Sequence, residues 1–135
     1  MPTAKFMTKK VITAKVTSTI RSVCKNMYDN NVGSVVIVNW TGEGVVPVGI
    51  ITERDVVKLI GLMEQFSPQV PIRSFMSYPL VTGSPAMTLS KAMEIMSKKN
   101  IRRLPITDKD MVRQKLVGII TEKDIVNAIV KPHRN

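Results

Sequence analysis

The sequence is poor in the residue types from which most catalytic and metal centres are built. Its 135 residues include one cysteine, Cys24, and one histidine, His133. A single cysteine cannot form an internal disulfide, and no Cys/His cluster has the spacing of a metal site. Cys24 falls on the apolar face of an expected helix, so we interpret it as a small core residue rather than a nucleophile. We therefore expect no metal and no cysteine chemistry.

Other signatures are missing as well. No apolar run approaches the roughly 20 residues that a membrane helix needs. The lysines near the start of the chain are not followed by the apolar stretch of a secretory signal. There is no Walker loop and no Gly-x-Gly-x-x-Gly after a strand. We expect a cytoplasmic protein that has no membrane segment and is not an enzyme.

Aromatic and acidic residues are also scarce. Aromatics make up 4% of the chain, and 20 lysines and arginines outnumber 10 acidic residues, which gives a net charge of +10. A basic protein attracts phosphate-bearing partners, although lysines on helix faces are often simply solvated. Base stacking needs aromatic platforms, and no helix-turn-helix or related reader is recognisable. The charge favours nucleic acid as a partner and the missing motifs count against it, so nucleic-acid binding is the alternative hypothesis.

The chain does contain an internal repeat. Residues 49–55, Gly-Ile-Ile-Thr-Glu-Arg-Asp, return at residues 118–124 as Gly-Ile-Ile-Thr-Glu-Lys-Asp. The same offset of 69 residues relates Thr19 to Thr88 without a gap. A period this long indicates two copies of a supersecondary unit that bury their apolar faces together. We expect one domain of two halves with paired, pseudo-symmetric sites.

Each half predicts the element order β-α-β-β-α. Thr19 and Thr88 are the expected N-caps of helices whose apolar residues recur at i, i+3, i+4 and i+7. The last helix of each half is expected to begin at Glu53 and at Glu122. The expected strands span residues 11–13, 34–38 and 47–51 in the first half and residues 80–82, 104–107 and 116–120 in the second.

Turns and boundaries follow from glycine, proline and polar residues. Residues 42–44 and 108–110 are expected to join the strand pairs. The expected division is a first repeat over residues 1–66, a proline-containing linker over residues 67–75 and a second repeat over residues 76–135. The last helix of each repeat is apolar around most of its circumference, so it needs cover from its own sheet and from the other half or a second chain. We expect a homodimer.

The repeated motif has two compatible interpretations. Thr52 with Asp55, and Thr121 with Asp124, have the spacing of a capping box, in which the pair satisfies backbone N–H groups at a helix start. A carboxylate can equally accept hydrogen bonds from both hydroxyls of a ribose. The cap can use the threonine while the aspartate faces a ligand.

A phosphate group needs a different partner. Acidic residues at both helix starts make these N-termini poor anion sites, so we expect basic side chains to contact the phosphate. The candidates are Arg54, Lys123 and one arginine of the pair Arg102 and Arg103.

The duplicated motif resembles a tandem pair of cystathionine-β-synthase (CBS) domains. The resemblance also rests on Ile-Arg-Arg-Leu-Pro-Ile at residues 101–106 and Val-Gly-Ser-Val-Val-Ile at residues 32–37, and it covers residues 7–130. It implies an α/β (α+β) fold of two β-α-β-β-α repeats packed through their sheets with pseudo-twofold symmetry. Such modules commonly dimerise, and clefts between their repeats bind AMP, ADP, ATP or S-adenosylmethionine.

The resemblance further implies a non-catalytic sensor of adenine nucleotides, with AMP favoured, that signals to an effector protein. The first site would comprise Thr13, Lys15, Ser34, Thr52, Arg54 and Asp55. The second site would comprise Thr82, Ser84, Arg103, Pro105, Thr121, Lys123 and Asp124. Because the first repeat has Gly33 and Ser34 where the second has its two arginines, we expect phosphorylated ligands to favour the second site.

Overall fold

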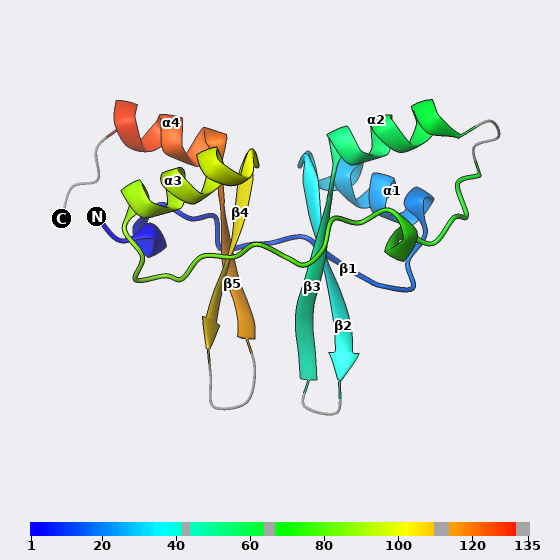
Figure 1. Cartoon of the computed structure of the whole chain (residues 1–135), viewed down its shortest axis with the longest axis horizontal. Helices are drawn as coiled ribbons and strands as arrows, with labels where there is room; N and C mark the ends of the chain where they lie inside the picture. The colour runs from blue at the N-terminus through cyan, green and yellow to red at the C-terminus, as the bar shows by residue number, and fades with distance from the viewer. Residues whose placement is uncertain (42–43, 64–66, 110–113, 132–135) are drawn as a thin grey trace. The chain divides into compact units, whose positions relative to one another are not determined.

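The computed structural model describes residues 1–41, 44–63, 67–109 and 114–131 and has a mixed α+β architecture (Figure 1). This confirms the predicted fold class. The first repeat contains β1 (Thr13–Lys15), α1 (Ile20–Asn30), β2 (Ser34–Thr41), β3 (Gly44–Thr52) and α2 (Glu53–Leu62). The second contains α3 (Leu89–Lys99), β4 (Arg103–Lys109), β5 (Gln114–Thr121) and α4 (Glu122–Val130). Two short 3-10 helices, η1 (Thr3–Lys5) and η2 (Ile72–Ser74), precede the repeats.

The helix starts agree with the sequence. The side chains of Thr19 and Thr88 accept hydrogen bonds from the backbone N–H groups of Ser22 and Lys91, which confirms both N-caps. α2 and α4 begin at the predicted residues. None of the helices in the described ranges is long and apolar enough to cross a membrane.

The first strand of each repeat was predicted wrongly. β1 begins two residues later than expected, because its parallel partners in β2 are Val36, Ile37 and Val38. In the second repeat residues 80–82 form no strand, and an isolated parallel bridge between Gly83 and Ile106 takes its place. Of the expected turns, residues 42–43 and 110 lie outside the described residues, and residues 108–109 belong to β4.

The chain forms two compact units whose bounds differ from those of the sequence repeats. The continuous unit comprises Ile12–Leu80, whereas the split unit combines Met1–Val11 with the chain from Val81 onward. Thr3 anchors the leading segment of the split unit, because it is fully buried and its hydroxyl donates to the carbonyl of Met87 at 2.7 Å. Further along, Thr8 and Ile119 exchange backbone hydrogen bonds at 2.9 Å.

The continuous unit contains the reciprocal arrangement. Its segment around η2 bonds through the N–H of Ile72 to the carbonyl of Ser18 at 3.0 Å. Ser77 pairs with Ile50 just as Thr8 pairs with Ile119 in the split unit. Each repeat therefore contributes its leading segment to the unit that contains the helices and the strand pair of the other repeat.

This exchange explains the glycine of the repeated motif. A Cβ atom on Gly118 would lie 2.8 Å from Cγ of Met7 and 3.0 Å from the carbonyl oxygen of Thr8. A Cβ atom on Gly49 would likewise lie 2.9 Å from the carbonyl oxygen of Ser77. The leading segments pass so close to β3 and β5 that no side chain fits at these two positions.

Each unit has its own apolar core. The core of the continuous unit consists of Ala14, Ile20, Val23, Met27, Val35, Ile37, Ile51, Leu59 and Ile72. The core of the split unit consists of Leu89, Ala92, Met96, Leu104, Ile106, Ile120 and Ala128, with Phe6 and Met7 packed against it. Cys24 packs against the first core, and burial raises the pKa of its thiol, which agrees with its interpretation as a core residue.

Candidate functional site

Both threonine-aspartate pairs form complete capping boxes. The N–H of Thr52 donates to Oδ2 of Asp55 at 2.9 Å, and the N–H of Asp55 donates back to the threonine hydroxyl at 3.2 Å. The corresponding distances for Thr121 and Asp124 are 3.0 Å and 3.2 Å. The capping interpretation is therefore correct for both repeats. Because each cap uses Oδ2, the second carboxylate oxygen of each half-buried aspartate is not needed for the helix start.

The strand pairs bring further candidate residues beside these caps. Ser34 lies directly opposite Thr52 in the antiparallel β2–β3 pair, and Arg103 lies directly opposite Thr121 in the β4–β5 pair. Ser34 is buried, whereas Arg103 is partly exposed. The two repeats thus present a small neutral side chain in one case and a cation in the other at the same position next to the Thr-x-x-Asp motif.

The two neighbouring arginines differ in their environment. Nε of Arg102 forms an ion pair with Oε1 of Glu122 at 3.2 Å, and both side chains are exposed. Arg103 forms no ion pair with any residue in the described ranges. Of the two guanidinium groups, only the one opposite Thr121 is without a carboxylate partner among the described residues.

The remaining candidates lie on the first strands and the first helical turns. Thr13 and Lys15 lie on β1 beside Val36 and Val38 of β2, and both are exposed. Arg54 and Lys123 are exposed in the first turns of α2 and α4, one residue before each aspartate.

In the split unit, Thr82 and Ser84 flank Gly83. Its N–H donates to the carbonyl of Pro105 at 2.9 Å, and its carbonyl accepts from the N–H of Thr107 at 2.9 Å. These bonds bring the 82–84 segment beside β4. The ring of Pro105 is fully buried, so it is a packing residue of β4 and is not exposed to a ligand.

Sequence reasoning missed one polar contact to the motif. The hydroxyl of Thr8 donates to Oδ1 and Oδ2 of Asp124 at 3.2 Å and 3.3 Å. The only sequence signal for this contact is the 69-residue offset, which makes Thr8 the counterpart of Ser77 but does not reveal which aspartate either residue approaches.

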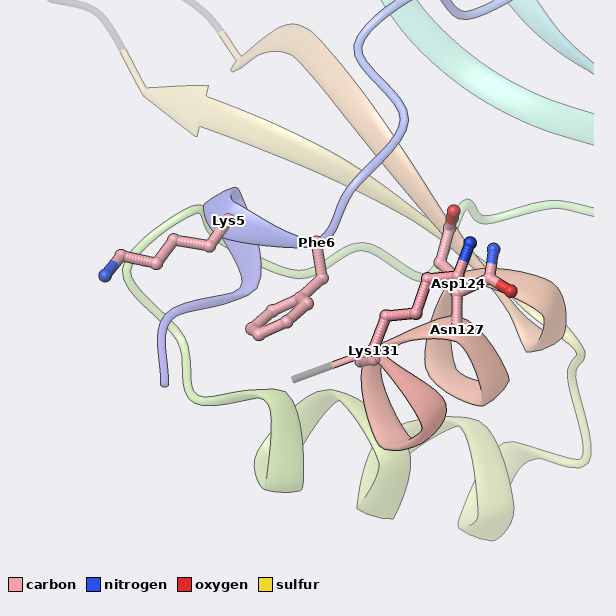
Figure 2. A pocket seen from close by; sticks show the side chains of 6 residues that line it. Lys5, Phe6, Asp124, Asn127 and Lys131 are labelled. Carbon is pink, nitrogen blue, oxygen red and sulfur yellow. The ribbon is translucent and has the colours of Figure 1, made fainter. Parts of the chain in front are cut away.

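Sequence reasoning also missed a pocket that begins at Asp124. The pocket has a volume of about 250 Å³ and lies between the leading segment and α4 of the split unit (Figure 2). Its lining residues are Lys5, Phe6, Asp124, Asn127, Ala128 and Lys131. Only Asp124 among them is one of the predicted site residues.

Comparison with known proteins identifies the fold and its relatives. A family model described as the CBS domain matches the chain twice, at residues 4–62 and 72–131. The protein MK0525 of Methanopyrus kandleri is 39% identical over 125 residues, which cover 93% of this chain and 60% of that protein. The CBS domain-containing protein YhcV of Bacillus subtilis is 35% identical over 119 residues, which cover 88% of this chain and 79% of that protein. The chain thus spans only part of the length of MK0525.

Solved structures of CBS proteins have the same fold. The CBS domain pair of protein MJ0100, in complex with 5'-methylthioadenosine and S-adenosyl-L-methionine, aligns with a TM-score of 0.83 at 25% identity over 98% of both chains. The CBS domain protein PAE2072 of Pyrobaculum aerophilum, complexed with AMP, aligns with a TM-score of 0.79 at 22% identity over 92% of this chain and 89% of that one. The two family matches, the curated relatives and these structures agree that the chain belongs to the CBS domain family and carries two CBS domains in tandem.

Proposed function

We propose that this tandem CBS pair is a non-catalytic regulatory module that binds an adenine nucleotide, with AMP as the favoured ligand. The observation that carries the proposal is the duplicated Thr-x-x-Asp box, in which each cap uses one carboxylate oxygen and leaves the other outside the capping box. The adenosine derivatives in the MJ0100 and PAE2072 structures support this class of ligand.

The aspartates are the proposed ribose contacts. An ionised carboxylate accepts from both hydroxyls of a vicinal diol, and such charge-assisted hydrogen bonds are stronger than neutral ones. Asp55 and Asp124 are half-buried, which limits competition from water. Thr52 and Thr121 add a hydroxyl beside each carboxylate.

The second repeat is the proposed stronger site for a phosphorylated ligand. Arg103 lies opposite Thr121 without an acidic partner among the described residues, whereas its counterpart Ser34 is neutral and buried. A guanidinium group binds phosphate oxygens bidentately, which a serine cannot do. AMP should therefore occupy the second site first.

The proposed output passes through exposed apolar residues on the last helix of each repeat. In α2, Val57 is 69% exposed and Leu62 is 76% exposed, and in α4, Ile129 is 72% exposed. Large apolar surface patches mark interfaces, and we propose that these side chains contribute to one. We assign it to a homodimer that reports the adenine nucleotide state of the cytoplasm to an effector protein. A ligand can drive this change only to the extent that it binds the two states with different affinity.

Calorimetric titration with AMP, ATP, S-adenosylmethionine, adenosine and pyrophosphate at two salt concentrations tests the proposal. Saturable binding of an adenine compound that persists at high salt is the expected result. Heat from the polyanions alone, lost as salt rises, would instead favour the alternative of a nucleic-acid-binding module that uses the net charge of +10.

A further inference from the structure

The pocket beside α4 extends the site from Asp124 toward the end of the helix. Asp124 and Asn127 share one face of α4 at i and i+3, and Lys131, the C-cap residue directly after the helix, follows them at i+7 and lines the same pocket. Ala128 forms the apolar part of that face, and Phe6 covers it from the leading segment. The pocket therefore brings together a carboxylate, an amide and an ammonium group, with an apolar wall beside them.

Lys5 and Lys131 of the pocket are not neutralised by an acidic residue in the described ranges. Figure 2 shows the side chain of Lys131 running back along α4 toward Asn127 and Asp124, whereas Lys5 extends away from them. Neither lysine forms an ion pair with any residue in the part of the chain that the structure describes. An anion in the pocket would meet the Lys131 ammonium and the Asn127 amide, and the flexible stem of Lys5 allows a second ammonium to turn toward it.

The first repeat lacks this arrangement. At the offset of 69 residues, the first repeat has Lys58, Leu59 and Leu62 where the second has Asn127, Ala128 and Lys131. Leu59 is 5% exposed and belongs to the core of the continuous unit, so its larger side chain fills the space that alanine leaves open. The combination of an amide, an alanine and a following lysine on this face is thus a feature of the second repeat.

We propose that this pocket holds the phosphate of a nucleotide whose ribose is bound by Asp124, with Lys131 and Asn127 as its contacts. The proposal rests on the proposed function and adds to it a phosphate contact on α4, beside the one expected from Arg103. The separation of Asp124 and Lys131 suits a ligand whose ribose is bound at one residue and whose phosphate is bound at the other. Asp124 lies in the first turn of α4 and Lys131 directly follows its last residue, a separation of about 10 Å along the axis, and the lysine side chain shortens this distance by running back toward the helix start.

The test compares AMP with adenosine by calorimetry for the wild type and three variants. Lys131→Gln removes the cation at an exposed position, and Ala128→Leu fills the pocket as the first repeat does. Lys25→Gln removes the same charge from an exposed position on α1 and serves as the control for net charge. We expect the first two variants to weaken AMP binding about tenfold and to leave adenosine binding unchanged, whereas the control should leave the binding of both ligands unchanged.

Two outcomes would overturn the inference. AMP affinity that is unchanged in Lys131→Gln would place the phosphate elsewhere, and equal losses for AMP and adenosine would show that the lysine does not contact an anion. Asp124→Ala separates this failure from that of the proposed function. If this variant loses nucleotide binding while Lys131→Gln keeps it, only the phosphate position is wrong, whereas unchanged binding in Asp124→Ala would contradict the proposed function at this site. Because Lys131 is exposed, its variant stays informative even if Ala128→Leu fails to fold.

Discussion

The hydroxyl of Thr8 donates to both carboxylate oxygens of Asp124, although 116 positions separate the two residues in the sequence. The same carboxylate also accepts from the backbone N–H and the hydroxyl of Thr121. The bonds from Thr121 belong to the helix cap, whereas the bond from Thr8 does not. A ribose that approaches Asp124 therefore competes first with Thr8.

Replacing Thr8 with valine keeps the shape of the side chain and removes the competing donor. We expect Thr8→Val to bind AMP about fivefold more tightly, since a side-chain hydrogen bond contributes about 1 kcal/mol and the acceptor here is a carboxylate. Calorimetry measures the change. Ser77→Ala is the matched control, because no hydrogen bond joins Ser77 to Asp55 in the described structure. Weaker binding by Thr8→Val would mean that Thr8 orients the carboxylate for the ligand.

Asp124→Ala should separate the ligand role of this residue from its structural role. Loss of the capping box should cost about 1 kcal/mol of stability, which denaturant unfolding measures. Nucleotide binding at the second site should be lost almost entirely, because Asp124 is the proposed acceptor for both hydroxyls of the ribose. Asp55→Ala has the same cap geometry and controls for the structural part. If both variants lose stability and keep full AMP affinity, the aspartates are helix-start residues alone.

Arg103→Ala should weaken AMP far more than adenosine, by about tenfold for AMP, because the lost interaction is a charge-assisted bond to phosphate. Arg102→Ala is the control, since its guanidinium group is already paired with Glu122. Calorimetric titration of both variants with AMP and with adenosine measures these losses of affinity. Equal losses for AMP and adenosine in Arg103→Ala would move the phosphate contact to another residue.

Gly118→Ala should destabilise the protein by about 1–3 kcal/mol, because the added methyl group overlaps the leading segment at Met7 and Thr8. Gly61→Ala is the opposite case, since a Cβ atom added at this position in α2 would meet no described atom within 4 Å. This second change should stabilise the helix by about 0.5–1 kcal/mol. Thermal unfolding of the two variants should therefore shift in opposite directions, and a shift in the same direction would contradict the close passage at Gly118.

Local patterns carried most of the fold prediction. The caps at Thr19 and Thr88 and the starts of α2 and α4 depend on side chains within one turn, so the sequence was enough to predict them. β1 was placed wrongly because a strand of three residues has no periodicity of its own and is defined by its partners in β2.

The candidate site likewise contains residues that local spacing predicts and residues that only long-range contacts reveal. Asp55 and Asp124 were visible in the sequence because each pairs with a threonine three residues before it. Thr8 and the pocket beside α4 were not, since both depend on the leading segment meeting a helix more than a hundred residues later. The sequence shows that glycine is repeated at residues 49 and 118. Only the structure shows that the leading segments pass too close to these positions for a side chain.

The exchange of leading segments also bears on the ancestry of the chain. A single repeat carries a leading segment that fits a neighbouring repeat, and its own glycine-bearing strand receives the segment of another repeat. Two identical copies of a one-repeat protein could therefore complete each other without any change of sequence. Gene duplication and fusion would preserve that reciprocal dependence in one polypeptide, and the halves could then diverge, as Ala128 and Leu59 have done, without losing the partnership that folds them.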